Sequence, residues 1–359
     1  MLIMLLDHVR ETVFLHMQVG DPVDPVTTSP ALFWMRFLSS FCAPTFVFLA
    51  GVSAYLYQQK HTRTETAKFL LKRGLILILL ELIVIGTAWT GVFPPQKFFL
   101  QIIWCIGICM VALGGLIYLP RKGQLVVAFL LIAGHNLLDP IVLEKDHWFH
   151  TPWAILHQRD MISIFGIPAR TSYPVLPWIG VILAGYLIGA WFTGTSEVRK
   201  KRFIISSGVL FLSFITLRAF NIYGDSPWVR YESLSQTMMG YFALTKYPVS
   251  LLFVLFTISV AMVALLCAEK WRDNLVVQKL AEFGSVAMFF YILHLYVLKV
   301  IYLALEKLFG TNKGVYYGVD HPYQFLLITI VIAVPLWYIC LKFRQFKEAR
   351  RDWKWLSYF

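Results

Sequence analysis

The chain has 359 residues, of which 58% are hydrophobic and only 14% are charged, and its mean hydropathy is +0.66. Soluble domains carry roughly 25% charged residues and about 45–50% apolar ones. This composition excludes a soluble globular fold, a disordered chain, collagen and a coiled coil, and it indicates a protein whose solvent is the lipid bilayer. The net charge of +12 is spread between apolar segments. We therefore expect membrane lipid as a partner and no nucleic acid.

Apolar segments long enough to cross a bilayer, about 20 residues each, follow one another along the whole chain. They predict an all-α, polytopic membrane protein with one domain over residues 1–359 and ten spans: 1–18, 31–58, 70–93, 98–119, 124–140, 174–193, 203–222, 247–268, 282–305 and 323–341. The first segment is short and polar, so we expect a first helix that is truncated or only partly embedded. An interfacial first helix would leave nine spans.

The distribution of Lys and Arg predicts the orientation of these spans. Of the 32 basic residues, twenty fall in one set of loops and the tail, eight in the alternate set and four at membrane depth. Because cytoplasmic loops carry the excess of Lys and Arg, we expect both termini on the cytoplasmic side of the inner membrane. The long polar loops at 141–173 and 223–246 then face outward.

The first span contains ionisable side chains, which are costly at membrane depth and mark candidate functional sites. On a helix Asp7 faces Arg10 and Glu11, while His8 faces Glu11. One interpretation is a helix end whose charges compensate one another at the headgroups. The other is a catalytic His8 held by a carboxylate, because imidazole can take and release a proton near neutral pH.

A second basic group lies where the third span begins. Lys68, Lys72 and Arg73 follow one another at the expected cytoplasmic end, and Glu81 lies about two turns deeper. The positive-inside rule by itself accounts for such a cluster. A cytoplasmic ligand that carries phosphate groups would use the same charges.

Polar residues also gather at the expected outer side. His135 and Asp139 are spaced as neighbours on a helix, so the pattern allows either an Asp-oriented histidine or a helix end before Pro140. Asp225 fits a turn, and Lys246 fits either an anionic ligand or the membrane interface. His294 lies near the middle of the ninth span, where an interhelical hydrogen bond is the simpler interpretation.

Metal chemistry is not indicated by the spacing of the His and Cys residues. The five cysteines lie in apolar segments and are interpreted as packing residues. His147, His150 and His157 share the long outer loop, yet their spacing matches no zinc signature. We expect no metal.

Several of these segments, taken together, carry a resemblance to a known family. They are Leu6-Asp7-His8-Val9-Arg10, Phe41-Cys42-Ala43-Pro44-Thr45-Phe46 with its continuation to Gly51, Arg73-Gly74, His135-Asn136-Leu137-Leu138-Asp139, Tyr173-Pro174-Val175-Leu176-Pro177-Trp178-Ile179-Gly180, Thr245-Lys246-Tyr247-Pro248 and Phe290-Tyr291-Ile292-Leu293-His294-Leu295-Tyr296. The chain resembles the bacterial membrane family related to the catalytic domain of heparan-α-glucosaminide N-acetyltransferase.

The resemblance implies a membrane acyltransferase that uses acetyl-CoA or another acyl-CoA as donor and a carbohydrate-like amine or hydroxyl as acceptor. The wider superfamily is similar in placing a functional histidine on the first helix, and His8 matches it. We expect His8 to act as general base or to carry the acyl group, with the other catalytic roles at Asp7, Glu11, Arg10 and His294. Donor phosphates are assigned to Arg73, Lys72 and Lys68, and the acceptor to His135, Asn136, Asp139, Trp178, Asp225 and Lys246.

A different functional class uses the same buried charges. A proton-coupled transporter or flippase of a polar or lipid-linked substrate would employ them as a relay, although no internal repeat favours it. The sequence leaves open the acyl group, the acceptor and the choice between a monomer and a homodimer.

Overall fold

The computed structural model describes residues 1–14 and 23–358, and it is mostly helical. Two compact units make up the chain. One comprises Met1–Cys42, Tyr231–Phe242 and Cys267–Phe359, and the other comprises Ala43–Arg230 and Ala243–Leu266. Each unit combines segments that are far apart in the sequence.

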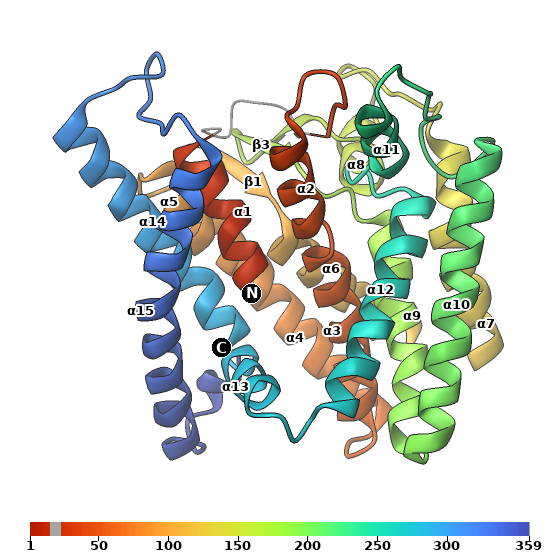
Figure 1. Cartoon of the computed structure of the whole chain (residues 1–359). Coiled ribbons are helices and arrows are strands. Elements are labelled where there is room, and N and C mark those ends of the chain that lie inside the picture. The colour runs from red at the N-terminus through yellow and green to blue at the C-terminus, as the bar shows by residue number, and fades with distance from the viewer. Residues whose placement is uncertain (15–22, 359) are drawn as a thin grey trace. The chain divides into compact units, whose positions relative to one another are not determined.

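The first unit is built around its N-terminal helix. Its elements are α1 (Leu2–Val13), α2 (Pro30–Ser39), α11 (Leu234–Phe242), α13 (Leu275–Gly284), α14 (Ala287–Phe309), α15 (Pro322–Ala349) and a 3-10 turn at Lys354–Tyr358. Helix α1 packs against α2, α14 and α15 (Figure 1). The backbone N–H of Val319 also donates to the carbonyl of Val13 at 2.8 Å, so the loop before α15 is tied to the end of α1.

The second unit holds the remaining helices. They are α3 (Cys42–Gln58), α4 (Arg63–Leu79), α5 (Gly86–Thr90), α6 (Ile102–Leu116), α7 (Arg121–Phe129), α8 (His150–Leu156), α9 (Leu176–Gly189), α10 (Ser196–Phe220) and α12 (Leu251–Lys270). Helix α6 packs against α4 and α9, and α7 packs against α9. A capping box starts α4, since Thr62 accepts from the backbone of Glu65 and Glu65 accepts from the backbone of Thr62.

Helices α3 and α9 approach each other at two glycines. A Cβ atom at Gly51 would lie 2.0 Å from the carbonyl oxygen of Ile182, and one at Gly185 would lie 2.0 Å from that of Phe48. Small residues of this kind let helix backbones pack closely in membranes. Gly51 ends one of the segments on which the family resemblance depends, and its packing gives that position a physical reason.

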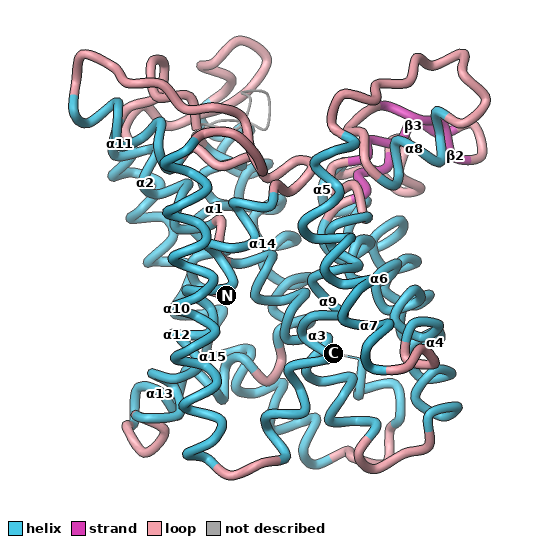
Figure 2. The backbone as a smooth tube through the Cα atoms, turned by 90° about the vertical axis from the view of Figure 1, so that its right-hand side faces the viewer, coloured by secondary structure: helices cyan, strands magenta, loops and turns pink. Residues whose placement is uncertain are grey.

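A small sheet corrects the expectation of an all-α fold. β1 (Phe98–Leu100) pairs in parallel with β3 (Ile167–Thr171), which pairs antiparallel with β2 (Met161–Ile164). Figure 2 shows β2 and β3 in magenta beside α8. Phe165 and Gly166 form the hairpin turn at positive φ, the conformation that two-residue hairpins favour. The fourth span was expected at 98–119. Its start was wrong, because residues 98–100 form β1 and the helix α6 begins at Ile102.

Six helical segments of the described residues are long and apolar enough to cross a membrane: Pro30–Gln58, Leu176–Thr193, Ser196–Phe220, Leu251–Lys270, Ala287–Phe309 and Pro322–Ala349. The chain is therefore a multi-pass membrane protein. π-helical turns at Leu80–Ile85 and Leu130–Gly134 interrupt the segments expected at 70–93 and 124–140. Part of the first expected span, 15–18, lies outside the described residues. The count of ten and the orientation stay predictions.

Candidate functional site

Two histidines from opposite ends of the chain meet inside the first unit. Nδ1 of His8 on α1 lies 2.7 Å from Nε2 of His294 on α14. The planes of the two rings are nearly parallel, with an angle of 5° between them, and their centroids are 5.0 Å apart. His294 is fully buried. Apolar residues at helical spacing bury the facing sides of α1 and α14 and thereby bring the two rings together.

The hydrogen bonds define which ring nitrogens carry the protons. Nδ1 of His294 lies 2.7 Å from the carbonyl oxygen of Phe290, and a carbonyl can only accept. In neutral His294 the proton is therefore on Nδ1, and Nε2 accepts from Nδ1–H of His8. This leaves the lone pair of neutral His8 on Nε2. In this arrangement Nε2 of His8 can accept a proton. Nδ1 of His8 donates to His294, whose own Nδ1 donates to the backbone of Phe290.

The charged neighbours of His8 converge on Arg10. Its guanidinium donates to Oδ1 of Asp7 at 2.7 Å and lies 3.5 Å from Oε1 of Glu11, and Arg10 is 3% exposed. The structure places Nε2 of His294 at Nδ1 of His8, and both carboxylates at the guanidinium of Arg10. Orientation of His8 by Glu11 or Asp7 stays a prediction. No pattern within one helix identifies a partner that comes from a distant helix.

Two of the expected acceptor residues join helix ends in the second unit. Nε2 of His135 lies 2.7 Å from the carbonyl oxygen of Val249, and the amide oxygen of Asn136 accepts from the backbone of Leu251 at 2.9 Å. Both contacts connect the end of the α7 segment with the start of α12. His135 and Asn136 therefore have a structural use at this position.

The carboxylate of Asp139, which was expected beside His135, is hydrogen-bonded to His157. Oδ1 of Asp139 accepts from Nε2 of His157 at 3.0 Å, and Asn136 donates to Oδ2 at 2.8 Å. The residues at 135–138 form a 3-10 turn, so the side chains of His135 and Asp139 do not follow α-helical spacing. From the sequence, His157 was noted only as one of three histidines in the long loop, whose spacing matches no zinc signature. His150 is paired in the same way with Asp160, at 3.0 Å.

A cluster of aromatic rings surrounds the next expected acceptor residues. Trp178 is fully buried, and its ring lies 5.7 Å from that of Tyr173. Nζ of Lys246 lies over both Tyr173, at 5.7 Å, and Tyr247, at 5.1 Å. Such an ammonium over aromatic faces is a cation–π arrangement. Trp178 and Lys246 thus both lie beside the ring of Tyr173.

Asp225 holds the loop that precedes α12. Its carboxylate accepts from the hydroxyl of Thr245 at 2.7 Å, from the backbone of Thr245 at 3.0 Å and from the hydroxyl of Ser250 at 2.5 Å. The backbone N–H of Ser226 adds a further bond to Oδ1, at 2.7 Å, and these donors together hold the turn. A turn was one of the two expectations for Asp225 from the sequence, beside binding of the acceptor.

The expected donor residues lie on the second and third turns of α4. Lys68 and Lys72 are exposed, and the guanidinium of Arg73 lies 5.9 Å from the ring centroid of Phe69. Glu81, in the π-helical turn that follows α4, is buried. Its Oε2 accepts from the backbone of Ile103 and of Trp104, each at 3.1 Å, which caps the start of α6.

Residues 1–14 and 23–358 contain no group of three or more His, Cys, Asp or Glu side chains placed to hold a metal ion.

One comparison with known proteins identifies a family. The family model described as "Heparan-alpha-glucosaminide N-acetyltransferase, catalytic" matches residues 17–224, more than half of the chain. No curated protein matches the chain significantly. The matched range contains the pair of Asp139 and His157 and the cations of α4, whereas His8 precedes it and His294 follows it.

Proposed function

Because the chain belongs to the heparan-alpha-glucosaminide N-acetyltransferase catalytic family, we propose that it is a membrane acyltransferase. It takes an acyl group, in the simplest case acetyl, from acyl-CoA at the cytoplasmic face of the inner membrane. The acceptor is a hydroxyl or amine of a carbohydrate-like molecule at the outer face. This orientation agrees with the excess of Lys and Arg in one set of loops.

The observation that carries the chemical assignment is the hydrogen-bonded pair of His8 and His294. Nε2 of His8 takes the proton from the acceptor hydroxyl or amine, and the acceptor atom attacks the thioester carbonyl. The carbon–sulfur bond then breaks, and the CoA thiolate leaves with the proton that His8 returns. His294 positions His8 and stabilises its protonated form, since its Nε2 accepts from Nδ1.

Charged side chains supply the remaining roles in this proposal. Arg10 is a buried cation on the helix of His8 and is assigned to the oxyanion, where one such donor is typically worth about 3–4 kcal/mol. The phosphates of the donor are assigned to Lys68, Lys72 and Arg73. The acceptor is assigned to the cluster of Tyr173, Trp178 and Lys246, because aromatic faces suit sugar rings.

The test uses the full chain purified in detergent, labelled acetyl-CoA and a mixture of cell-envelope glycans, with mass spectrometry of the labelled product. We expect His8→Gln to lower the transfer rate by roughly 10²–10⁴-fold. His61→Gln, which removes an exposed histidine, is the matched control and should leave the rate unchanged. Full transfer by His8→Gln would exclude His8 as the base.

A second pair of variants examines the positioning role of His294. In His294→Gln the amide oxygen can still accept from Nδ1 of His8, whereas in His294→Phe it cannot. We expect kcat to fall far more in the Phe variant, with a change in the pH profile and little change in KM for acetyl-CoA. Equal losses in both variants would contradict a positioning role.

Ligand binding distinguishes a transferase from the alternative, a transporter or flippase. Acyl-CoA should raise the thermal unfolding temperature of a transferase, because a ligand of the native state stabilises it. A protein that is indifferent to acyl-CoA, and that moves protons with its substrate in vesicles, would favour transport.

A further inference from the structure

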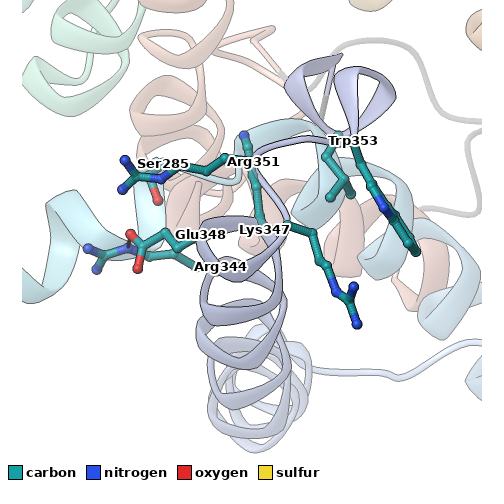
Figure 3. A pocket seen from close by; sticks show the side chains of 8 residues that line it. Ser285, Arg344, Lys347, Glu348, Arg351 and Trp353 are labelled. Atoms are coloured by element: carbon teal, nitrogen blue, oxygen red, sulfur yellow. Dashed lines mark hydrogen bonds and ion pairs between the residues drawn. The ribbon is translucent and has the colours of Figure 1, made fainter.

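A pocket of about 290 Å³ lies where α15 ends and the chain turns back (Figure 3). Its lining comes from α15, from the turn that follows it and from Ser285 between α13 and α14. Four of the lining residues are cations and one is an anion: Arg344, Lys347, Arg350, Arg351 and Glu348. We propose that this pocket binds the phosphate group of a membrane-surface ligand, either the headgroup of an anionic phospholipid or a phosphate of an acyl-CoA.

One of the pocket's cations, Arg344, also joins two helices. Nε of Arg344 lies 2.9 Å from Oε1 of Glu348, and its Nη1 lies 3.5 Å from Oε1 of Glu282 on α13. Arg344 therefore joins α13 to α15, and Glu282 is also paired with Lys279 at 3.0 Å. Lys347, Arg350 and Arg351 add three positive charges to the pocket.

The turn after α15 gives the pocket a fixed wall. Leu356 is buried, at 2% exposure, and its backbone N–H donates to the carbonyl of Trp353 at 3.0 Å. The ring of Trp353 packs edge-on against Phe346, with centroids 5.8 Å apart, and the guanidinium of Arg350 lies 5.4 Å from the Trp353 ring centroid. The basic residues thus belong to a folded site and not to an extended tail.

The chemistry and the position of the pocket both suit phosphate. Arg guanidinium groups match phosphate oxygens with paired N–H donors, and Lys adds a point charge. The pocket lies at the end of α15, an apolar helix long enough to span a membrane. Basic clusters beside such helices attract anionic headgroups, and Trp is typical of the membrane interface. Binding of a phospholipid headgroup in this pocket does not depend on the proposed acyltransferase activity.

The experiment compares the wild type with a variant that removes three charges, Lys347→Gln, Arg350→Gln and Arg351→Gln. Arg344 is kept because it joins α13 to α15. The control is Lys200→Gln, Lys201→Gln and Arg202→Gln, which removes equal charge from the first turns of α10. The full chain is placed in nanodiscs of phosphatidylcholine with phosphatidylglycerol, and native mass spectrometry counts retained phosphatidylglycerol. A second arm measures binding of CoA to the same variants in nanodiscs of phosphatidylcholine alone.

We expect the pocket variant to bind its ligand roughly 100-fold more weakly than the control does. Loss confined to phosphatidylglycerol identifies the lipid headgroup, and loss confined to CoA identifies the nucleotide phosphates. If pocket and control variants lose binding equally, the effect is net charge alone and the proposal is wrong. Unchanged binding of both ligands in the pocket variant would overturn it as well, provided that thermal unfolding shows the variant to be folded.

Discussion

Asp139 and His157 are joined by a hydrogen bond of 3.0 Å between Oδ1 and Nε2. Because the carboxylate accepts, Nε2 carries the proton, and in a neutral ring the lone pair is on Nδ1. Nδ1 is buried and has no hydrogen-bond partner among residues 1–14 and 23–358. The second unit therefore has its own imidazole with a buried acceptor atom, inside the range that matches the family.

This pair should behave as one energetic unit. We expect Asp139→Ala and His157→Phe each to lower the free energy of unfolding by about 1–3 kcal/mol, because either change leaves a polar partner without its bond. The double variant should be little worse than the singles, which a double-mutant cycle of SDS-induced unfolding in mixed micelles measures. Strictly additive losses would mean that the two side chains do not interact.

Glu81 is expected to act as a cap for α6. Glu81→Ala removes the acceptor for the backbone N–H groups of Ile103 and Trp104. It should therefore lower the free energy of unfolding by about 1–3 kcal/mol. Glu81→Gln keeps one amide oxygen and should cost much less, as thermal unfolding in detergent can check. If Gln were as harmful as Ala, the charge of Glu81 would matter more than its hydrogen bonds.

The glycine contact between α3 and α9 should not tolerate a methyl group. Gly185→Ala would place Cβ 2.0 Å from a backbone oxygen, so the helices must separate, at a cost of about 1–3 kcal/mol. Gly208→Ala on α10 is the control, since a Cβ there meets nothing within 4 Å. We expect the control to be neutral or to stabilise the helix by up to about 1 kcal/mol. Both variants are compared by thermal unfolding. Equal unfolding midpoints for Gly185→Ala and Gly208→Ala would refute the close contact between α3 and α9.

The loop that carries β2 and β3 should respond to acid through Asp160. Its hydrogen bond with His150 is the main cause that lowers the pKa of Asp160 below the ordinary value of 3.8. A lowered pKa in the folded state stabilises the protein above that ordinary value, and the contribution is lost as the pH falls through the lowered pKa.

Asp160→Asn should therefore be about 1 kcal/mol less stable than the wild type at pH 6, with the difference shrinking toward zero below about pH 4. Thermal unfolding of both proteins across this range gives the difference. A gap that is the same at every pH would show that ionisation of Asp160 does not contribute.

Composition and apolar spacing determined the class of this protein. Hydropathy depends on residue type alone, so the sequence was sufficient to predict a helical membrane protein, and its motifs were sufficient to indicate the family. The same reasoning missed the hairpin at Phe165 and Gly166, because its short alternating strands look like a polar loop. It also treated the segments around Glu81 and His135 as regular helices, although π-helical and 3-10 turns interrupt them.

The site was decided by tertiary structure. Helical spacing reports contacts three or four residues apart, and it correctly placed Asp7 beside Arg10. His8 and His294 are 286 residues apart, and the partner of Asp139 lies beyond it in the loop that follows. Which side chains meet across helices depends on how buried faces pack, and that information is spread over the whole chain and not held in any local pattern.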